Sequence, residues 1–243
     1  LKDLINSVIK NKCDFGIAFD GDGDRIGIVD DLGRTVPGDL ILLLLAEDVL
    51  KSNKNASIIA DVKCSQVVFD RINNIGGKAI ISKTGHSNIK LNMKKHDAIF
   101  AGEMSGHMFF ADNYFGFDDA LYAAVRFVNM MARSNSKLSD IVDDLPKVFN
   151  TPEVRFFCED EKKFEFIEKL KQKQLEKKKE IIDLDGIRVN SEDGWWLMRA
   201  SNTQPSLVFR CEAKTRNKLH EIVNDLKKDV EIIDKKIAKQ ILT

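Results

Sequence analysis

Apolar and polar positions alternate in two distinct ways along the first 150 residues of the chain. Segments in which apolar residues recur every three to four positions are predicted helices, and short unbroken apolar runs are predicted strands. The predicted helices are 1–11, 40–50, 66–74, 88–95 and 118–133. The predicted strands are 15–19, 26–29, 57–62, 79–82 and 98–101. This alternation of strands with helices favours a mixed, mainly parallel α/β domain.

The pattern changes after Asn150, Thr151 and Pro152. One strand and a strongly charged helix come first, then a series of short strands, and finally a long helix. The predicted elements are strands 154–158, 181–184, 187–189, 195–199 and 207–212, and helices 161–179 and 217–233. This succession predicts a smaller α+β domain with an antiparallel sheet, which begins near residue 150.

Composition narrows the class of protein. The 243 residues include 38 Lys plus Arg and 38 Asp plus Glu, so the formal net charge is zero and a nucleic-acid partner is not expected. The longest apolar stretch, 40–46, is far too short to span a membrane, and we expect no membrane partner. The four cysteines are scattered, which is typical of reduced thiols in a cytoplasmic protein. The chain opens on Leu1 within a predicted helix, and we expect it to be a fragment that lacks an N-terminal part.

The loop between the first two predicted strands carries Asp20, Asp22 and Asp24, with glycines between them. Three carboxylates this close repel one another unless they share a cation, and oxygen ligands indicate Mg²⁺ or Ca²⁺. Arg25 indicates a phosphate at the same place. An acidic surface turn is one alternative. An EF-hand is another, although Arg25 stands where that motif needs glycine and the flanking segments are strands.

Three further loops offer polar side chains at predicted strand ends, and the first of them, 83–87, follows a strand of the α/β domain at the end where such proteins bind ligands. Residues 83–87, Lys-Thr-Gly-His-Ser, place His86 at a helix start, and Lys63 follows the strand 57–62. Residues 102–107, Gly-Glu-Met-Ser-Gly-His, combine donors and acceptors that suit sugar hydroxyls. Residues 199–205, Arg-Ala-Ser-Asn-Thr-Gln-Pro, can surround a phosphate. Each loop has a purely structural alternative: a helix cap for His86 and ordinary polar turns for the other two.

Taken together and in order, these loops resemble those of the α-D-phosphohexomutase family, most closely its bacterial phosphomannomutase/phosphoglucomutase branch. The resemblance covers nearly the whole chain. It implies that residues 1–35 end the family's second domain, that 36–150 form its third domain and that 151–243 form its fourth. From this resemblance we expect that the chain lacks the family's first domain, which carries the phosphoserine loop.

The resemblance implies reversible transfer of phosphate between the 1 and 6 positions of hexose phosphates, through an enzyme phosphoserine and a hexose 1,6-bisphosphate intermediate. Mg²⁺ would be held by Asp20, Asp22 and Asp24. The catalytic residues that it implies are Arg25, Lys63, His86 and His107. The substrate-binding residues that it implies are Glu103, Ser105, Arg199, Ser201, Asn202, Thr203 and Arg210.

Two alternatives to this function are retained. A phosphoglucosamine mutase usually has Gln at the position of Met104 and Ser-Gly-Thr in the phosphate loop, so the sequence disfavours it. The second alternative is that the isolated fragment is a non-catalytic module that binds phosphosugar and metal. The preferred hexose is left open between mannose and glucose.

Overall fold

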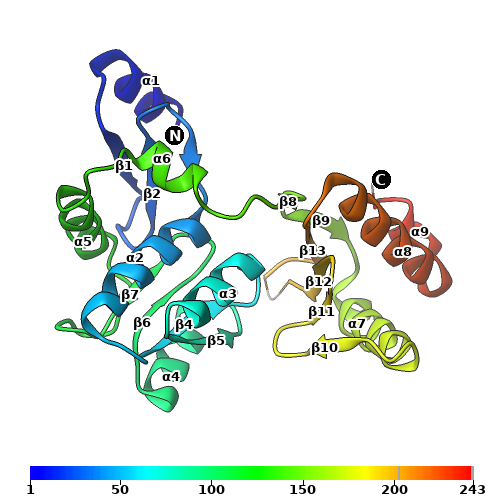
Figure 1. The fold of residues 1–243 in the computed structure, drawn as a ribbon. Helices are drawn as coiled ribbons and strands as arrows, with labels where there is room; N and C mark the ends of the chain where they lie inside the picture. The colour runs from blue at the N-terminus through cyan, green and yellow to red at the C-terminus, as the bar shows by residue number, and fades with distance from the viewer. Residues whose placement is uncertain (202, 242–243) are drawn as a thin grey trace. The chain divides into compact units, whose positions relative to one another are not determined.

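A computed structural model describes residues 1–201 and 203–241 of the chain (Figure 1). The chain divides into two compact units, Leu1–Pro146 and Lys147–Thr243, and each is described by itself. The break falls close to the boundary predicted near residue 150. A further boundary after residue 35 stays a prediction. None of the described helices combines the length and the apolar character that crossing a bilayer requires.

The first unit begins with α1 (Lys2–Asn11) and a three-stranded antiparallel sheet. Its strands, in spatial order, are β1 (Phe15–Phe19), β2 (Ile26–Asp30) and β3 (Thr35–Val36). Pairing of Phe19 with Ile26 makes β1 and β2 a hairpin. The six residues between them are the acidic loop, which is therefore fixed at both of its ends.

The second sheet of this unit has the order β5-β4-β6-β7. Strand β4 is parallel to β5 and β6, whereas β7 is antiparallel to β6, so the mixed, mainly parallel prediction is confirmed. The elements are α2 (Gly38–Ser52), β4 (Ser57–Asp61), α3 (Gln66–Asn74), β5 (Lys78–Ser82), α4 (His86–His96), β6 (Ala98–Gly102), β7 (Met108–Phe110), α5 (Ala120–Ala132) and α6 (Leu138–Asp143).

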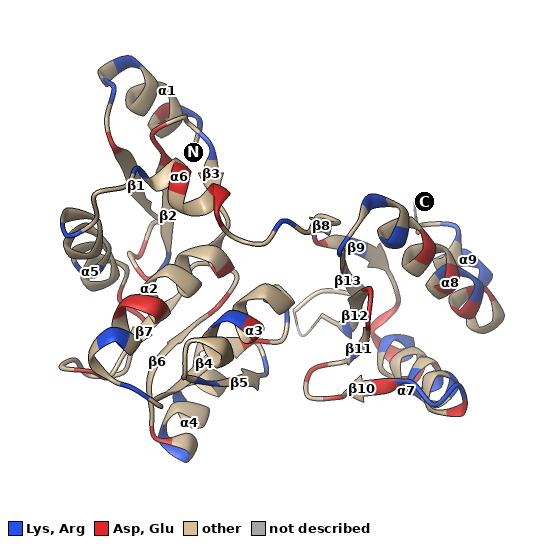
Figure 2. Ribbon diagram, viewed as in Figure 1, with Lys and Arg blue, Asp and Glu red and all other residues tan. Residues whose placement is uncertain are grey.

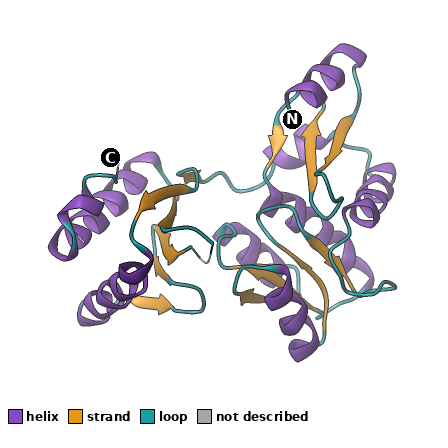
Figure 3. Ribbon diagram, turned by 180° about the vertical axis from the view of Figure 1, so that it is seen from behind, coloured by secondary structure: helices purple, strands orange, loops and turns teal. Residues whose placement is uncertain are grey.

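Helices cover both faces of this sheet (Figure 3). Helix α4 packs on one face through Ile89 and Met93, which cluster with Ile59 of β4. Helix α2 approaches the other face, where Leu42 packs against Gly102. Because β4, β5 and β6 are parallel, the segments that follow them leave the same edge of the sheet. Lys63 and Glu103 lie in the loops after β4 and β6, and His86 begins the helix after β5.

The second unit is an antiparallel sheet with helices, as the sequence predicted. Its strand order is β10-β11-β12-β13-β8, and β9 also pairs with β13. The elements are β8 (Phe149–Asn150), β9 (Val154–Phe157), α7 (Asp160–Glu176), β10 (Glu180–Ile182), β11 (Ile187–Ser191), β12 (Gly194–Ala200), β13 (Ser206–Ala213), α8 (Arg216–Ile233) and α9 (Lys235–Ala238). Lys, Arg, Asp and Glu are interspersed along α7 and α8 (Figure 2).

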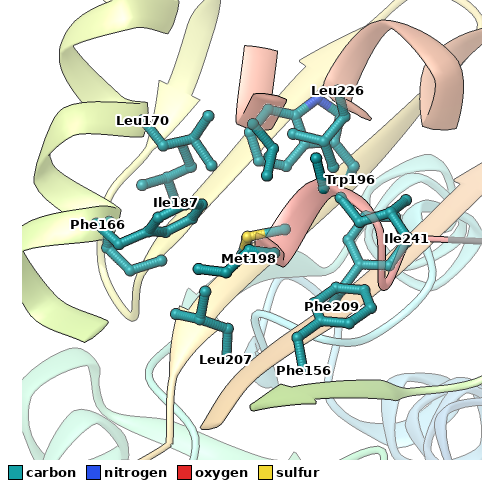
Figure 4. Close-up of a cluster of buried hydrophobic side chains, with 14 of the residues drawn as sticks. Phe156, Phe166, Leu170, Ile187, Trp196, Met198, Leu207, Phe209, Leu226 and Ile241 are labelled. Carbon is teal, nitrogen blue, oxygen red and sulfur yellow. The ribbon is translucent and has the colours of Figure 1, made fainter. Parts of the chain in front are cut away.

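Alternation along β12 separates two kinds of surface. Trp196 and Met198 join Leu170 of α7 and Leu226 of α8 in the apolar core of this unit (Figure 4). The side chain of Trp195 lies on the other face of the sheet. Its indole N–H donates to Glu212 at 2.9 Å, and the guanidinium of Arg188 lies 3.9 Å from the centre of its ring. The period of two thus places the helices on one face and a buried polar arrangement on the other.

Five short elements escaped prediction: β3, β7, β8, α6 and α9. Three of them are strands of two or three residues, which give no measurable periodicity. They exist because neighbouring strands offer them hydrogen-bond partners, as when Phe110 of β7 pairs with Phe100 of β6. Tertiary pairing, rather than local preference, forms these strands.

The carboxyl group of Asp61, at the end of β4, lies in the interior. Its Oδ1 accepts from the amide of Lys63 at 3.0 Å, and its Oδ2 has no hydrogen-bond partner among the described residues. Burial raises the pKa of Asp61 from 3.8 to about 6, and only part of this rise is opposed by the charge of Lys63. The folded chain therefore binds this proton more tightly than the unfolded chain does.

Because the folded pKa is the higher one, the stabilising contribution of Asp61 is complete below about pH 4 and is lost as the pH rises toward 6. We expect Asp61→Asn, which keeps the Oδ1 acceptor, to abolish this loss. Urea unfolding measures this. The free energy of unfolding of the wild-type chain, minus that of the variant, should fall by about 3 kcal/mol as the pH rises from 4 to 6. Asp144→Asn, at an exposed carboxyl, is the matched control. Parallel profiles for wild type and Asp61→Asn would contradict the assignment.

Candidate active site

The acidic loop brings its three carboxylates together. Asp20, Asp22 and Asp24 each present an oxygen, and these oxygens all lie within 4.8 Å of one another. Gly23, at φ +74°, supplies the left-handed backbone conformation that lets the chain turn between them. The hairpin of β1 and β2 therefore converts an every-second-residue pattern into a cluster of oxygens.

Arg25 closes the loop onto its first carboxylate. Its amide donates to Oδ1 of Asp20 at 3.1 Å, and its side-chain Nε contacts Oδ2 of the same residue. Slight desolvation opposes ionisation of Asp20, but the bonds from Arg25 outweigh it and lower the pKa of this carboxyl to about 2. Asp22 is exposed and accepts no hydrogen bond from the residues that the structure describes. The loop thus combines a fixed anion with an accessible one.

The loop 103–107 joins β6 to β7 and lies directly beside the acidic loop. Gly106 makes this approach possible, because a Cβ at its position would lie 2.6 Å from the carbonyl oxygen of Ile26. The amide of Ile26 donates to the carbonyl of Gly106 at 3.1 Å, and Arg25 and His107 form an antiparallel bridge. Two hairpins from the two sheets of the first unit are joined through these bonds.

His107 connects the side chains of the two loops. Its Nε2 lies 3.2 Å from Oδ2 of Asp24, and its Nδ1 lies 3.0 Å from Oε2 of Glu103 and 2.9 Å from Oγ of Ser105. Partial burial opposes protonation, but the two carboxylates outweigh it and raise the pKa of His107. Since both ring nitrogens face a carboxylate, the imidazolium form satisfies both contacts.

Glu103 is a buried residue with both carboxylate oxygens engaged. Its Oε1 accepts from the amide of Gly85 at 2.6 Å, while its Oε2 faces His107. Burial opposes ionisation, but these two donors outweigh it and lower the pKa of Glu103, and the charge of Lys63 acts in the same direction. Glu103 therefore ties the loop before α4 to the loop after β6.

His86 occupies the first position of α4 and is largely exposed. Its Nδ1 lies 3.9 Å from Oδ2 of Asp118, and Lys90 contacts the other oxygen of Asp118 at 3.1 Å. Asp118 also lies with Asp24 and His107 in a second group whose ligand atoms are within 4.8 Å of one another. The sequence pattern did not single out Asp118, because it lies in the first turn of the predicted helix 118–133, where an aspartate has an ordinary structural role. In the structure the helix begins later, and Asp119 caps α5 by accepting from the amide of Tyr122.

The remaining candidate residues belong to the second unit. Arg199, at the end of β12, has its Nε 3.0 Å from Oδ2 of Asp185, a partner that the sequence analysis did not identify. Ser201 is buried, and its Oγ accepts from the amides of Thr203 and Gln204 at 3.4 and 3.2 Å. Arg210 is buried on β13, with its guanidinium 5.9 Å from the ring of Trp195. Asn202 lies outside the described residues.

The donor set of the acidic loop fits a magnesium ion. Mg²⁺ binds oxygen at about 2.0–2.1 Å, so opposite ligands of one ion lie about 4.2 Å apart. The three carboxylate oxygens already lie within 4.8 Å of one another and need only small movements to meet this geometry. Three carboxylates leave positions for further oxygen ligands, such as those of a phosphate.

Comparison with known proteins gives the same family for both units. The model described as "Phosphoglucomutase/phosphomannomutase, alpha/beta/alpha domain III" matches residues 37–149, and that described as "Phosphoglucomutase/phosphomannomutase, C-terminal domain" matches residues 153–228. A phosphomannomutase/phosphoglucomutase from Pseudomonas syringae pv. tomato is 44% identical over 222 residues, which are 91% of this chain and 48% of that protein.

Solved structures agree with this assignment. A phosphoglucomutase/phosphomannomutase family protein from Burkholderia thailandensis superposes with a TM-score of 0.89 at 37% identity, over 98% of this chain and 50% of that one. An N-acetylphosphoglucosamine mutase from Aspergillus fumigatus, in complex with GlcNAc-6P and magnesium, has a TM-score of 0.66 at 14% identity over 88% and 48%, which shows a shared fold alone. The chain spans about half the length of these relatives. It belongs to the phosphoglucomutase/phosphomannomutase family, with the family's domain III and C-terminal domain in its two units.

Proposed function

We propose that this chain is part of a phosphohexomutase about twice its length, which transfers phosphate between the 1 and 6 positions of hexose phosphates, mannose and glucose among them. The observation that carries the proposal is the contact of His107 with Asp24 and Glu103. This contact joins the acidic loop, whose carboxylates suit a metal ion, to the loop 103–107, whose side chains suit sugar hydroxyls. The 44% identity to a relative named for this activity supports it. None of the four cysteines, all of which lie in the described part of the chain, forms a disulfide, and this supports a cytoplasmic location.

In the proposed reaction, a phosphoserine of the preceding polypeptide transfers its phosphoryl group to a sugar hydroxyl. The serine oxygen–phosphorus bond breaks, a sugar oxygen–phosphorus bond forms, and the hydroxyl proton passes to a base. The resulting hexose 1,6-bisphosphate turns around, and its other phosphoryl group returns to the serine. Mg²⁺, when bound by Asp20, Asp22 and Asp24, would neutralise charge on the transferring phosphoryl group.

Residues of this chain have distinct tasks in that reaction. Arg25 would hold the oxygens of the transferring group beside the metal loop. Glu103 and Ser105 would bind ring hydroxyls, and Lys63 and His86 would lie at the reacting end of the sugar. Lys63 and His86 would assist the movement of the hydroxyl proton, and His107, which faces Asp24 and Glu103, would hold these two carboxylates in place. Arg199, Ser201, Asn202, Thr203 and Arg210 would bind the phosphate that is not being transferred.

The 243-residue chain alone should not interconvert hexose phosphates. None of its serines lies in a context like Thr-Ala-Ser-His-Asn-Pro, which we expect around the phosphoserine of the family. Incubation with glucose 1-phosphate, Mg²⁺ and a glucose 1,6-bisphosphate primer should give no glucose 6-phosphate above background. The full-length protein is the positive control. Turnover by the isolated chain would mean that the nucleophile has been misplaced.

The metal loop is tested by Asp22→Asn in the full-length protein. Loss of one of three clustered charges should raise the Mg²⁺ concentration needed for half-maximal activity and should lower kcat more than it changes KM, because the metal stabilises the transferring group. Titration calorimetry with Mg²⁺ measures the binding loss directly. Asp144→Asn again serves as the control. Unchanged activity of Asp22→Asn at limiting Mg²⁺ would refute the metal assignment.

The phosphate loop is tested by Arg199→Ala. Charge-assisted hydrogen bonds contribute about 1.5–3 kcal/mol, so KM should rise roughly 10- to 150-fold. Glucose 1-phosphate and mannose 1-phosphate should be affected by the same factor, since the loop binds phosphate and not the ring. Arg216→Ala, at an exposed arginine, is the control. A rise confined to one hexose would contradict the assignment, and dominant wild-type activity on glucosamine 1-phosphate would favour the amino-sugar alternative.

A further inference from the structure

Lys163 is a buried lysine in the second unit. It is the fourth residue of α7 and is only 4% exposed. Lysine is among the residues least often buried, because an ammonium group loses its hydration in the interior. Such a residue is retained only where protein acceptors replace water, so the acceptors of Lys163 indicate its role.

Three oxygens surround the ammonium group of Lys163. Its Nζ donates to Oδ1 of Asp160 at 2.6 Å, to the carbonyl oxygen of Ser201 at 2.6 Å and to the carbonyl oxygen of Gln204 at 3.2 Å. An ammonium group has three hydrogens to donate, so its capacity is fully used. Two of the three acceptors belong to the loop between β12 and β13, and none belongs to the sheet itself.

The positive charge of Lys163 does not stabilise helix α7. A cation near the start of a helix opposes the helix dipole. Asp160 is two-thirds exposed, and ion pairs with such a partner contribute little to stability. The two loop carbonyls are therefore the partners that explain why the ammonium is held inside.

These two carbonyls bracket the loop that contains the predicted phosphate donors. Ser201 opens the connection from β12, and its amide donates to the carbonyl of Ser206 at 2.9 Å. Gln204 ends the bracketed stretch, and its side chain accepts from Arg155 at 3.1 Å. One ammonium group thus sets the separation of the two ends of 201–204.

The direction of these carbonyls matters for an anion. Amide hydrogens attract a phosphate, whereas carbonyl oxygens that face it repel it. The carbonyls of Ser201 and Gln204 face Lys163 in the interior, so they do not face a phosphate bound on the outer side of the loop. Asp160 offsets the charge of Lys163, and the effect of the lysine on phosphate binding is accordingly one of geometry more than of long-range attraction.

We propose that Lys163 is a positioning residue for substrate phosphate: its ammonium group holds the carbonyls of Ser201 and Gln204 and so fixes the loop in the conformation that binds the phosphate not being transferred. This inference rests on the proposed function, which assigns the loop to that phosphate. A replacement of Lys163 acts through the loop and not through contact with the substrate.

The test compares Lys163→Met and Lys163→Arg with wild type in the full-length protein. Methionine fills a similar volume without donors, and arginine keeps the charge but presents a wider fork. The matched control is Lys162→Met, since Lys162 is the adjacent residue of α7 but is exposed and pairs with Glu159. The measurements are kcat and KM for glucose 1-phosphate and for mannose 1-phosphate, the Kd of glucose 6-phosphate by calorimetry, and the thermal unfolding midpoint.

Lys163→Met should raise KM for both sugars at least tenfold, with the Kd of glucose 6-phosphate rising by the same factor and kcat changing less than threefold. This split follows because the loop binds substrate and transition state alike. Lys163→Arg should give intermediate values, and Lys162→Met should stay within twofold of wild type. A merely structural lysine would lower kcat with the folded fraction and leave KM and Kd unchanged, and that result would overturn the proposal.

Two outcomes separate this inference from the proposed function. If Arg199→Ala raises KM but Lys163→Met does not, the loop binds phosphate and the role of Lys163 is wrong. If neither variant alters the Kd of glucose 6-phosphate, the assignment of the loop itself fails, and the inference fails with it. Should Lys163→Met not fold, Lys163→Arg decides alone, because an unchanged KM and Kd in that folded variant would overturn the proposal.

Discussion

Repulsion among Asp20, Asp22 and Asp24 is the constraint on which the first unit's site depends. Their oxygens lie within 4.8 Å of one another on a loop of six residues. Such a cluster is stable only where cations face it. Arg25 faces it from the loop itself, and His107 faces Asp24 from the neighbouring hairpin. The mutual position of the two hairpins therefore follows from where the negative charge must be balanced.

Balancing that charge organises the rest of the site. His107 can face Asp24 only because Gly106 lets the second hairpin approach the backbone of β2. The other ring nitrogen of His107 then meets Glu103, which in turn fixes the amide of Gly85 next to His86. A chain of contacts runs from the metal-type loop to the start of α4. These contacts are short and mostly shielded from water, and electrostatic interactions are stronger in the protein interior than at the surface.

The second unit uses one buried cation for a related purpose. Lys163 satisfies the carbonyls of Ser201 and Gln204 from beneath their loop, much as Arg25 satisfies Asp20. In both units, a cation that the protein itself supplies contacts a short polar loop: Arg25 contacts Asp20, and Lys163 binds the carbonyls of Ser201 and Gln204. A contact that restrains a binding loop in advance lowers the entropy that ligand binding must overcome.

Most of the fold could be predicted from the sequence. Periodicity located the long helices and the five- to eight-residue strands, such as β4 and β13, because those patterns are local. Spacing also placed the three aspartates in one loop and the candidate residues at strand ends. The sequence could not locate β7 or β8, whose two or three residues become strands only through partners elsewhere in the chain.

The partners of the site residues were decided by tertiary structure alone. Sequence identified Asp24, Glu103 and His107 separately, but 83 residues separate Asp24 from His107, and no local rule relates them. The sequence pattern did not single out Asp118, Asp185 or Lys163. An aspartate in the first turn of a predicted helix, an aspartate in a turn and a lysine on a charged helix all have ordinary structural explanations. Side-chain chemistry and short-range pattern are written in the sequence, whereas the distance between two charges is set by how the sheets and helices pack.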